Sequence, residues 1–391
     1  MVEVLPFKGL GFKPGNLKEI ITEPYDKISN DLQRTYYERS ENNFIRLNLP
    51  TGTDPHNSAK KTLEEWRNNG TLKEDQSPFF YEYIEEFDLY GVKRKRIGLF
   101  AIVRLEDYGE KNIFRHERTL LNPKDDRLKM LRATQTDLEP ILFLYDDVDM
   151  ELMKIIGSAD KENESDFVDE NGTRHILKRF ESPEITTFFK QKKLVIADGH
   201  HRYESALAYG KEVGFTGGTR YVMAVLVNRY DSGLVVIASH RVVQSGALPA
   251  EKLLEGLKEN FVIEEIDKRE VLDPLKSDII FYYKSHYFSL TPSENLLASS
   301  TNVEKLNASL LNTLIIPQIT KLSEGNPITY TRSASDAIRK VDDGEARYAF
   351  LLKPIDPGTV WEVAIEGKVM PEKSTDFFPK LASGLKMFRL N

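Results

Sequence analysis

A short apolar stretch, 194–197, runs directly into the polar sequence Asp-Gly-His-His-Arg at residues 198–202. The stretch predicts a buried strand, because it is brief, rich in branched residues and followed by a glycine turn signal. The residues after the glycine predict a helix over about 202–213, with Ala206, Leu207 and Val213 on its buried side. A strand that passes through a tight turn into a helix is typical of α/β architecture.

The same turn is suited to binding an anion. Gly199 lets the backbone approach a ligand closely, and the start of the helix presents unpaired N–H groups and the positive end of the helix dipole. His200, His201 and Arg202 add donors here, and Asp198 is placed to orient a bound phosphate or to reach a metal ion through water. Asp198 and His200 are therefore also candidate catalytic residues. The segment therefore predicts a site for phosphate groups.

A simpler interpretation of this turn stays open. Asp198 can act only as a helix cap, with His200 and His201 on the surface. A metal site made of side chains alone fits less well. Neighbouring side chains at a helix start diverge, and no His-x-x-x-His spacing occurs.

Composition excludes several classes of function. The 54 Lys and Arg residues against 61 Asp and Glu give a net charge of −7, which argues against sequence-independent binding to nucleic acid or lipid. There are no cysteines, so disulfides, thiolate zinc sites and cysteine nucleophiles are excluded. The apolar runs are shorter than the roughly 20 residues that cross a bilayer, and the N-terminus lacks signal-peptide features. We therefore expect a soluble cytoplasmic protein.

Short strands interspersed with helices predict an α/β to α+β fold with mixed sheets. We expect three parts, over 1–110, 111–245 and 246–391, and a mobile polar excursion over 161–171. The expected strands cover 79–89, 92–105, 141–145, 194–197, 221–228, 234–239, 261–266, 328–331 and 348–352, with a hairpin over 279–290. The expected helices include one ended by Gly70, one beginning at Pro123, one through Leu306 and Leu314, and those over 183–191, 202–213, 250–259 and 333–341.

A second cluster of charged residues covers 115–119, where we expect a strand or loop edge. In a strand, His116 and Arg118 face one way and Glu117 the other. If one face meets the 198–202 turn, Glu117 is a candidate general base, Arg118 a candidate phosphate clamp and His116 a further candidate phosphate ligand. The alternative is an exposed strand whose charges pair with a neighbouring strand.

Six further residues are weaker candidates, each with a structural alternative. The turn aspartate can bond local backbone, the helix arginine can pair with an aspartate, and the His-Arg pair can close a strand end. The Lys-Ser pair in the C-terminal part can act as a lid or simply pack. These residues are Asp26, Arg127, His240, Arg241, Lys373 and Ser374.

The Asp-Gly-His-His-Arg segment resembles the signature of domain-of-unknown-function family 1015, a distant relative of the ParB/sulfiredoxin-like fold. The resemblance extends over essentially the whole chain, although Glu23 stands where the family usually has a proline. The matching segments are residues 5–9, 24–26, 115–119, 123–127, 197–203, 239–243, 370–375, 378–380 and 383–385.

The resemblance implies a ParB/sulfiredoxin-like core with additional α+β portions. In that fold group a similar turn holds nucleotide phosphates, and a related free serine kinase transfers phosphate from ADP to serine. The implied activity is that of a small-molecule phosphotransferase or nucleotide hydrolase. It would use ADP or ATP with Mg²⁺ and a hydroxyl-bearing metabolite. A regulatory module that binds a nucleotide or phosphorylated metabolite without turnover is the alternative, and a ParB-like nuclease or DNA-partitioning role conflicts with the acidic charge.

Overall fold

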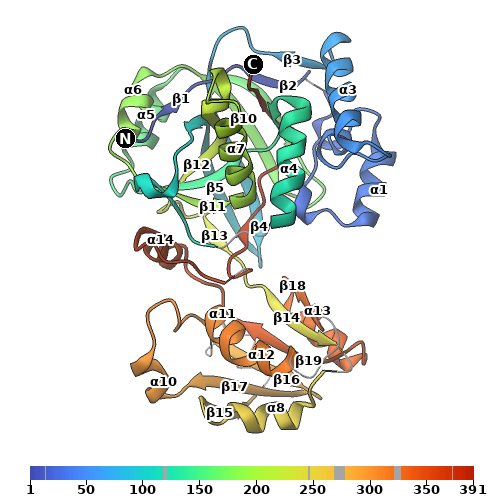
Figure 1. Ribbon diagram of the computed structural model, residues 1–391, viewed down its shortest axis with the longest axis vertical. Coiled ribbons are helices and arrows are strands. Elements are labelled where there is room, and N and C mark those ends of the chain that lie inside the picture. Colours follow the sequence, from blue (N-terminus) through green and yellow to red (C-terminus); the bar gives the residue numbers. More distant parts are fainter. Residues whose placement is uncertain (14, 118–120, 245–246, 268–277, 321–326, 372) are drawn as a thin grey trace. The chain divides into compact units, whose positions relative to one another are not determined.

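The computed structural model describes residues 1–13, 15–117, 121–244, 247–267, 278–320, 327–371 and 373–391. The chain forms two compact units. The first contains residues 1–115, 119–235 and 379–391, and the second contains 236–378 with the short stretch that begins at His116. Figure 1 labels the helices and strands of each unit.

The first unit contains a mixed nine-stranded sheet and a smaller four-stranded sheet. The large sheet has the order β6-β11-β8-β12-β5-β4-β10-β9, with β1 paired to β5, and the small one has the order β3-β2-β21-β7. The strands are β1 (Val4–Leu5), β2 (Gly9–Phe12), β3 (Leu72–Glu74), β4 (Phe80–Leu89), β5 (Val92–Arg104), β6 (Ile113–Arg115), β7 (Thr136–Asp137), β8 (Ile141–Tyr145), β9 (Glu162–Val168), β10 (Arg174–Phe180), β11 (Leu194–Asp198), β12 (Tyr221–Asn228) and β21 (Met387–Arg389).

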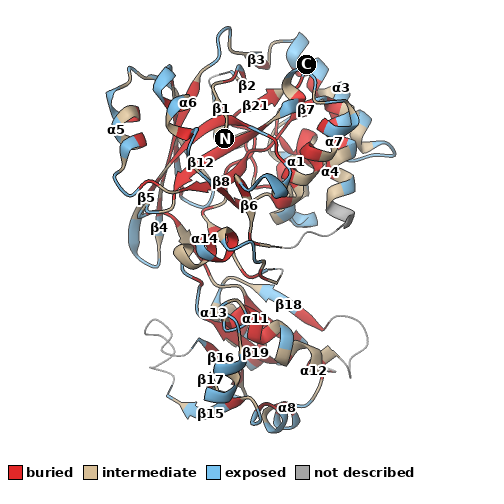
Figure 2. Ribbon diagram, turned by 60° about the vertical axis from the view of Figure 1, so that its left-hand side comes forward, coloured by how far each residue is buried: buried red, intermediate tan, exposed pale blue. Residues whose placement is uncertain are grey.

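Helices cover the strands that lie deepest in the large sheet. In β8 every residue is buried, and in β12 all but the first are, as Figure 2 shows. Such continuous apolar strands need cover on both faces. The helical elements are η1 (Leu17–Glu19), η2 (Tyr25–Lys27), α1 (Asn30–Arg39), α2 (Ile45–Asn48), α3 (Pro55–Asn68), η3 (Tyr108–Glu110), α4 (Leu121–Thr134), α5 (Glu151–Ser158), α6 (Pro183–Phe189), α7 (His200–Glu212) and η4 (Gly217–Arg220). Helix α7 contacts both β8 and β12 and lies beside α4 (Figure 1).

The second unit is built on an antiparallel six-stranded sheet with the order β15-β17-β16-β19-β14-β18. Along β19, Tyr348 and Phe350 enter one apolar cluster, whereas Ala349 and Leu351 enter another, so the strand buries both faces by simple alternation. The elements are β13 (Val235–Val236), β14 (His240–Gln244), α8 (Ala250–Leu257), β15 (Phe261–Ile266), β16 (Ile279–Tyr283), β17 (His286–Pro292), α10 (Glu294–Ser299), α11 (Asn307–Leu310), the π-helical turn η5 (Leu311–Ile315), α12 (Ile316–Thr320), β18 (Ile328–Thr331), α13 (Ala334–Asp342), β19 (Ala346–Leu352), α14 (Pro357–Ile365) and β20 (Phe377–Phe378).

The predicted mixed α/β class is confirmed. Parallel pairs such as β6–β11 and β8–β12 lie in the same sheet as antiparallel pairs. The strands predicted over 79–89 and 92–105 form the β4–β5 hairpin, which turns at Tyr90 and Gly91, both with positive φ. The ParB/sulfiredoxin-like character of the core stays a prediction.

The mobile excursion predicted over 161–171 is wrong, because Glu162–Val168 forms the edge strand β9 and pairs with β10. The carboxylate of Asp169 accepts the N–H groups of Asn171 and Thr173 at 2.9 Å each, which fixes the hairpin turn. The polarity that suggested mobility is instead the polarity of an exposed sheet edge.

The strand predicted over 234–239 is also wrong in its position. Only Val235–Val236 is extended in a ladder there, and the longer strand β14 begins at His240. His240 and Arg241 therefore start a strand rather than follow one. The apolar run 234–239 alone did not indicate that the longer strand begins at His240.

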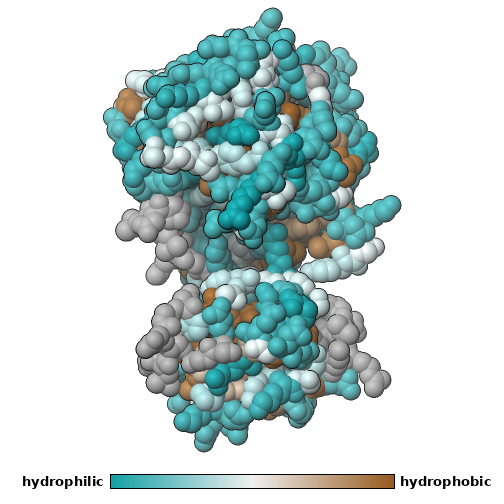
Figure 3. All heavy atoms as spheres, turned by 90° about the vertical axis from the view of Figure 1, so that its right-hand side faces the viewer, coloured by the Kyte–Doolittle hydropathy of each residue, from teal (hydrophilic) through white to brown (hydrophobic). Residues whose placement is uncertain are grey.

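None of the helices in the described ranges has the length and apolarity needed to cross a bilayer. On the face in Figure 3, hydrophilic residues dominate and hydrophobic ones are scattered.

A buried ion pair joins neighbouring strands of the large sheet. Glu85 and Arg96 lie opposite each other on β4 and β5, with 2.7 Å between Arg96 Nε and Glu85 Oε2, and both side chains are at most 1% exposed. Arg96 also donates to the carbonyl of Pro379 at 2.7 Å, which attaches the C-terminal segment to the sheet. Burial raises the pKa of Glu85, and the charge of Arg96 opposes this shift.

We expect Arg96→Met to lower the free energy of unfolding by about 3–5 kcal/mol, because Glu85 then keeps a buried charge without its cation. The double variant Arg96→Met/Glu85→Leu should lose less than the single variant. Urea unfolding measures both, with exposed Lys95→Met as a control that changes stability by less than about 0.5 kcal/mol. A double variant less stable than Arg96→Met would contradict this account.

Candidate functional site

The strand-to-helix turn forms as the sequence predicted, but Asp198 is not a helix cap. Strand β11 ends at Asp198, Gly199 takes the left-handed conformation at φ +95°, and α7 begins at His200. No described side chain caps the start of α7. A Cβ at position 199 would lie 3.1 Å from the guanidinium of Arg202, so glycine is required by both its φ and its close contact.

Asp198 is held between two cations. Its Oδ1 accepts from Lys380 Nζ and its Oδ2 from Arg202 Nη2, each at 2.8 Å. Burial alone would raise the pKa of Asp198, but the charges of Lys380 and Arg202 outweigh it and hold the pKa well below its usual range. The guanidinium of Arg202 also donates to the carbonyl of Pro140. These contacts make the turn rigid.

A buried carboxylate supports this turn from another side. Glu139, 3% exposed, accepts through Oε1 from Ser383 Oγ at 2.6 Å, Asn48 Nδ2 at 2.9 Å and the Tyr25 N–H at 3.2 Å. Its negative charge also stabilises the charge on Arg202. Four segments far apart in the sequence therefore meet at Glu139.

The two weaker candidates of the first unit lie near this carboxylate. Arg127 is 6% exposed, stacks 4.2 Å from the centre of the Tyr25 ring and bonds to Asp126 at 2.6 Å. Asp26 is exposed on the η2 turn, and its charge acts on Arg202. Arg127 thus forms the aspartate pair that the sequence left open, although its guanidinium is buried.

A small cavity of about 30 Å³ lies beside Arg202 and Glu139, large enough for one or two water molecules. Asp137 lines it and accepts the Met223 N–H at 2.7 Å. Burial raises the pKa of Asp137 to about 7, although this N–H and the charge of Arg202 oppose the shift. A carboxyl group that titrates near neutral pH thus adjoins the turn.

The two histidines of the turn differ in exposure. His200 is 7% exposed, and His201 is half-buried. Both rings are therefore partly covered by protein, so the interpretation as plain surface residues does not describe them.

His116 and Glu117 of the second charged cluster belong to the other unit. Glu117 Oε1 accepts the Lys373 N–H at 2.9 Å, and the buried His116 lies 2.9 Å from Thr375 Oγ1 through its Nε2. His116 and Glu117 thus bind the segment around Lys373. Arg118, the predicted phosphate clamp, lies outside the described residues. The predicted catalytic role of Glu117 stays a prediction.

The remaining candidates of the second unit have structural partners. His240 Nδ1 accepts the Leu352 N–H at 3.1 Å, and burial lowers the pKa of His240 to about 4. Arg241 is 1% exposed and donates to the carbonyl of Lys373 at 3.2 Å. Ser374 donates to the carbonyl of Pro371 at 2.6 Å. These contacts favour the packing alternative for the Lys-Ser pair over a lid.

The structure adds two residues that sequence reasoning missed as site residues, Lys380 and Glu139. Lys380 lies in one of the segments that carry the family resemblance, and that position was the available signal. Glu139 had no local signal, because its three donors come from distant parts of the chain.

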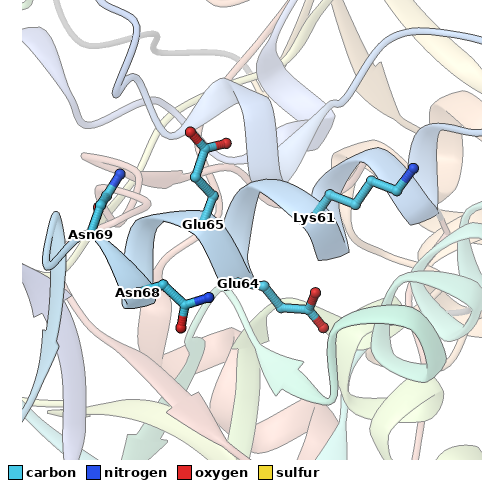
Figure 4. Close-up of a pocket in the computed structure, with 5 residues that line it drawn as sticks. All are labelled: Lys61, Glu64, Glu65, Asn68 and Asn69. Atoms are coloured by element: carbon cyan, nitrogen blue, oxygen red, sulfur yellow. The ribbon is translucent and has the colours of Figure 1, made fainter.

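Other parts of the described chain provide weaker candidates for a functional site than the 198–202 turn. The described residues contain no group of three or more His, Asp or Glu side chains that could hold a metal ion. Figure 4 shows a hollow along α3 lined by Lys61, Glu64, Glu65, Asn68 and Asn69. Their side chains point in different directions from one helix, so they do not converge on a ligand (Figure 4).

The family model for DUF1015, a protein of unknown function, matches residues 4–312. The chain belongs to DUF1015. This confirms the resemblance that the sequence motifs carried. The DUF1015 protein is also 26% identical over 184 residues to an ATP-dependent L-serine kinase from Staphylothermus marinus. That match covers 47% of this chain and 66% of the kinase, so this chain spans just under two thirds of that relative.

Two solved structures are distantly similar to the DUF1015 protein. One is a free serine kinase in complex with AMP, with 14% identity, a TM-score of 0.43, and coverage of 75% of this chain and 91% of that chain. The other is a conserved hypothetical protein from Pyrococcus furiosus, with 16% identity, a TM-score of 0.40, and coverage of 73% and 94%. Likenesses this distant carry no argument about activity.

We expect Asp198 to make stability depend on acid pH. Because its folded-state pKa lies below the ordinary value of about 3.9, the ionised form contributes stability that is fully present above about pH 5 and is lost at lower pH. The difference in unfolding free energy between wild type and Asp198→Asn should shrink by about 1–3 kcal/mol between about pH 6 and 2. Urea unfolding at several pH values measures it. Asp107→Asn, which affects an exposed pair with Lys211, is the control, and an equal pH dependence there would refute the expectation.

Asp137 should make the stability fall, rather than rise, as the pH increases. The unfolded chain releases this proton above about pH 3.9, whereas the folded protein keeps it until about pH 7, so wild-type stability falls across that interval and then levels. Asp137→Asn should lack this component, and the variant should gain on the wild type from about pH 4 to 8. Thermal or urea unfolding tests this, with exposed Asp149→Asn as the control. Identical slopes for wild type and Asp137→Asn would show that the carboxyl stays ionised.

Proposed function

We propose that this protein binds ATP or ADP through its phosphates at residues 198–202 and transfers a phosphate group to a hydroxyl of a small metabolite. The observation that carries the proposal is the rigid turn of β11 and α7, where Gly199 leads into a helix start that no described side chain caps. The distant sequence similarity to an ATP-dependent L-serine kinase supports the same class of reaction.

Each residue of the turn has a separate part in this proposal. The backbone N–H groups at the start of α7, with His200 and His201, hold the phosphate oxygens. Lys380 and Arg202 hold Asp198 and add positive charge close to the phosphates. Asp198 orients the turn, because both its oxygens already accept from cations.

Magnesium would enter with the nucleotide. Mg²⁺ is commonly bound by one or two carboxylates, waters and substrate phosphates, so a preformed cluster of three ligands is not required. Asp198 is the carboxylate of the turn, and it would reach the ion through water. The ion supplies charge neutralisation on the phosphates.

In the reaction, the acceptor oxygen forms a bond to the terminal phosphorus as the bond to the leaving nucleotide oxygen breaks. The acceptor proton passes to a carboxylate. Glu117 is the base that the sequence suggested, and Asp26 is the exposed carboxylate beside Arg202 in the first unit. The variants Glu117→Gln and Asp26→Asn distinguish them, because only loss of the base lowers kcat more than nucleotide affinity.

Calorimetric titration with ADP, ATP and CTP, with and without Mg²⁺, tests binding. Incubation with ATP and L-serine, followed by phosphate-product detection, tests transfer with the acceptor of the distant relative. Binding with no product in a single turnover would support the regulatory alternative. No heat with any nucleotide at about 1 mM would end the proposal.

We expect Gly199→Ala to lower nucleotide affinity about tenfold or more, because the new Cβ lies 3.1 Å from the Arg202 guanidinium and φ is +95°. Gly214→Ala is a matched control: Gly214 has φ +74° just beyond α7, with open space around its Cβ position. Gly214→Ala should lose a similar amount of thermal stability, because its φ is also positive, but should keep normal nucleotide affinity. If the two variants bound nucleotide with equal affinity, the turn would not be the nucleotide-binding site.

A further inference from the structure

A polar groove of about 520 Å³ in the first unit shares no lining residue with the 198–202 turn. This volume lies within the usual range for small-molecule sites, about 300–1,000 Å³. The groove is lined by residues of β2, β3, β9, β10 and the C-terminal segment. These are Gly11, Phe12, Lys13, Lys73, Glu74, Asp75, Gln76, Ser77, Phe79, Asn163, Glu164, Arg179 and Lys386.

An ion-pair network makes part of the groove lining rigid. Lys386 Nζ lies 3.0 Å from Asp75 Oδ2 and 3.2 Å from Glu164 Oε2, and its side chain is only 5% exposed. Arg179 pairs with the same two carboxylates, at 3.3 and 3.1 Å. Tyr81 also donates to Asp75 Oδ2 at 2.5 Å. The carboxylates of Asp75 and Glu164 are thus committed to cations that already belong to the protein.

Two lysines remain beyond this network. Lys73 lies opposite Gly11 in the β2–β3 ladder, and the Lys13 N–H donates to the Thr71 carbonyl, so Lys13 and Lys73 are diagonal neighbours on one face. Glu74, the third carboxylate of the groove, pairs with Arg389 at 3.1 Å. Among the described carboxylates none forms an ion pair with Lys13 or Lys73.

This arrangement favours a negatively charged ligand. Two like charges on adjacent strands repel each other and disfavour the sheet locally, and a bound anion would remove that cost. Gly11, opposite Lys73, lets the Leu385 carbonyl and the Lys386 side chain approach the strand closely, because a Cβ there would meet them at 3.3 Å and 3.4 Å. We propose that this groove binds a small organic anion bearing a phosphate or carboxylate group, at a site separate from the 198–202 turn.

The test uses sodium phosphate and sodium succinate as probes of the two sources of negative charge. In the full-length wild type, either probe should slow acetylation of Lys13 and Lys73, read by mass spectrometry, while exposed Lys93 and Lys95 react at unchanged rates. Protection by one probe only identifies the preferred anion. No protection by either at about 10 mM would overturn the proposal.

Two double lysine variants test whether the anion probe binds in the groove. Lys13→Gln/Lys73→Gln should weaken binding of the protecting probe about tenfold in calorimetry, since charge-assisted contacts are lost. Lys93→Gln/Lys95→Gln makes the same charge change elsewhere and should stay within about twofold. Circular dichroism tests whether both double variants fold. An equal loss of probe affinity in both would show that the groove is not the binding site. Gly199→Ala should keep probe binding, so failure of the nucleotide proposal and failure of this one give different results.

Discussion

The pairing of Asp198 with Lys380 and Arg202 is the interaction on which the candidate site depends. A partly covered carboxylate is stable as an anion only when cations or donors offset its desolvation. Here one cation comes from the first turn of α7 and the other from the C-terminal segment. The same pairing fixes the end of β11 and the direction of α7, so it decides where the backbone N–H groups at the helix start point.

The C-terminal segment connects otherwise separate features of the first unit. Pro379 accepts from Arg96, Lys380 pairs with Asp198, Ser383 donates to Glu139, and Lys386 pairs with Asp75 and Glu164. Strand β21 then joins the small sheet. Each contact places a polar group of this segment on a buried or half-buried partner. Thirteen residues at the end of the chain thus complete the core, the candidate turn and the groove.

The distribution of charge separates the two proposed sites physically. At the turn, the cations Lys380 and Arg202 surround one carboxylate, and the helix start adds further positive potential. In the groove, Asp75 and Glu164 pair with Lys386 and Arg179, and Glu74 pairs with Arg389. Lys13 and Lys73 carry positive charge beyond these pairs. Both sites are proposed to bind anions, the turn through backbone donors and the groove through side chains. Both proposed sites thus depend on local cations in a chain whose net charge is −7.

The sequence by itself determined the elements whose signals are local. The apolar run of β11, Gly199 and the amphipathic pattern of α7 are adjacent along the chain, and so are the strands and turn of the β4–β5 hairpin. Only the tertiary structure decided that Lys380 and Glu139 adjoin the turn, that residues 162–168 form an edge strand, and that Glu117 holds the Lys373 backbone. Those outcomes depend on which distant segments supply partners for polar groups. A local pattern of residue types carries no information about such partners.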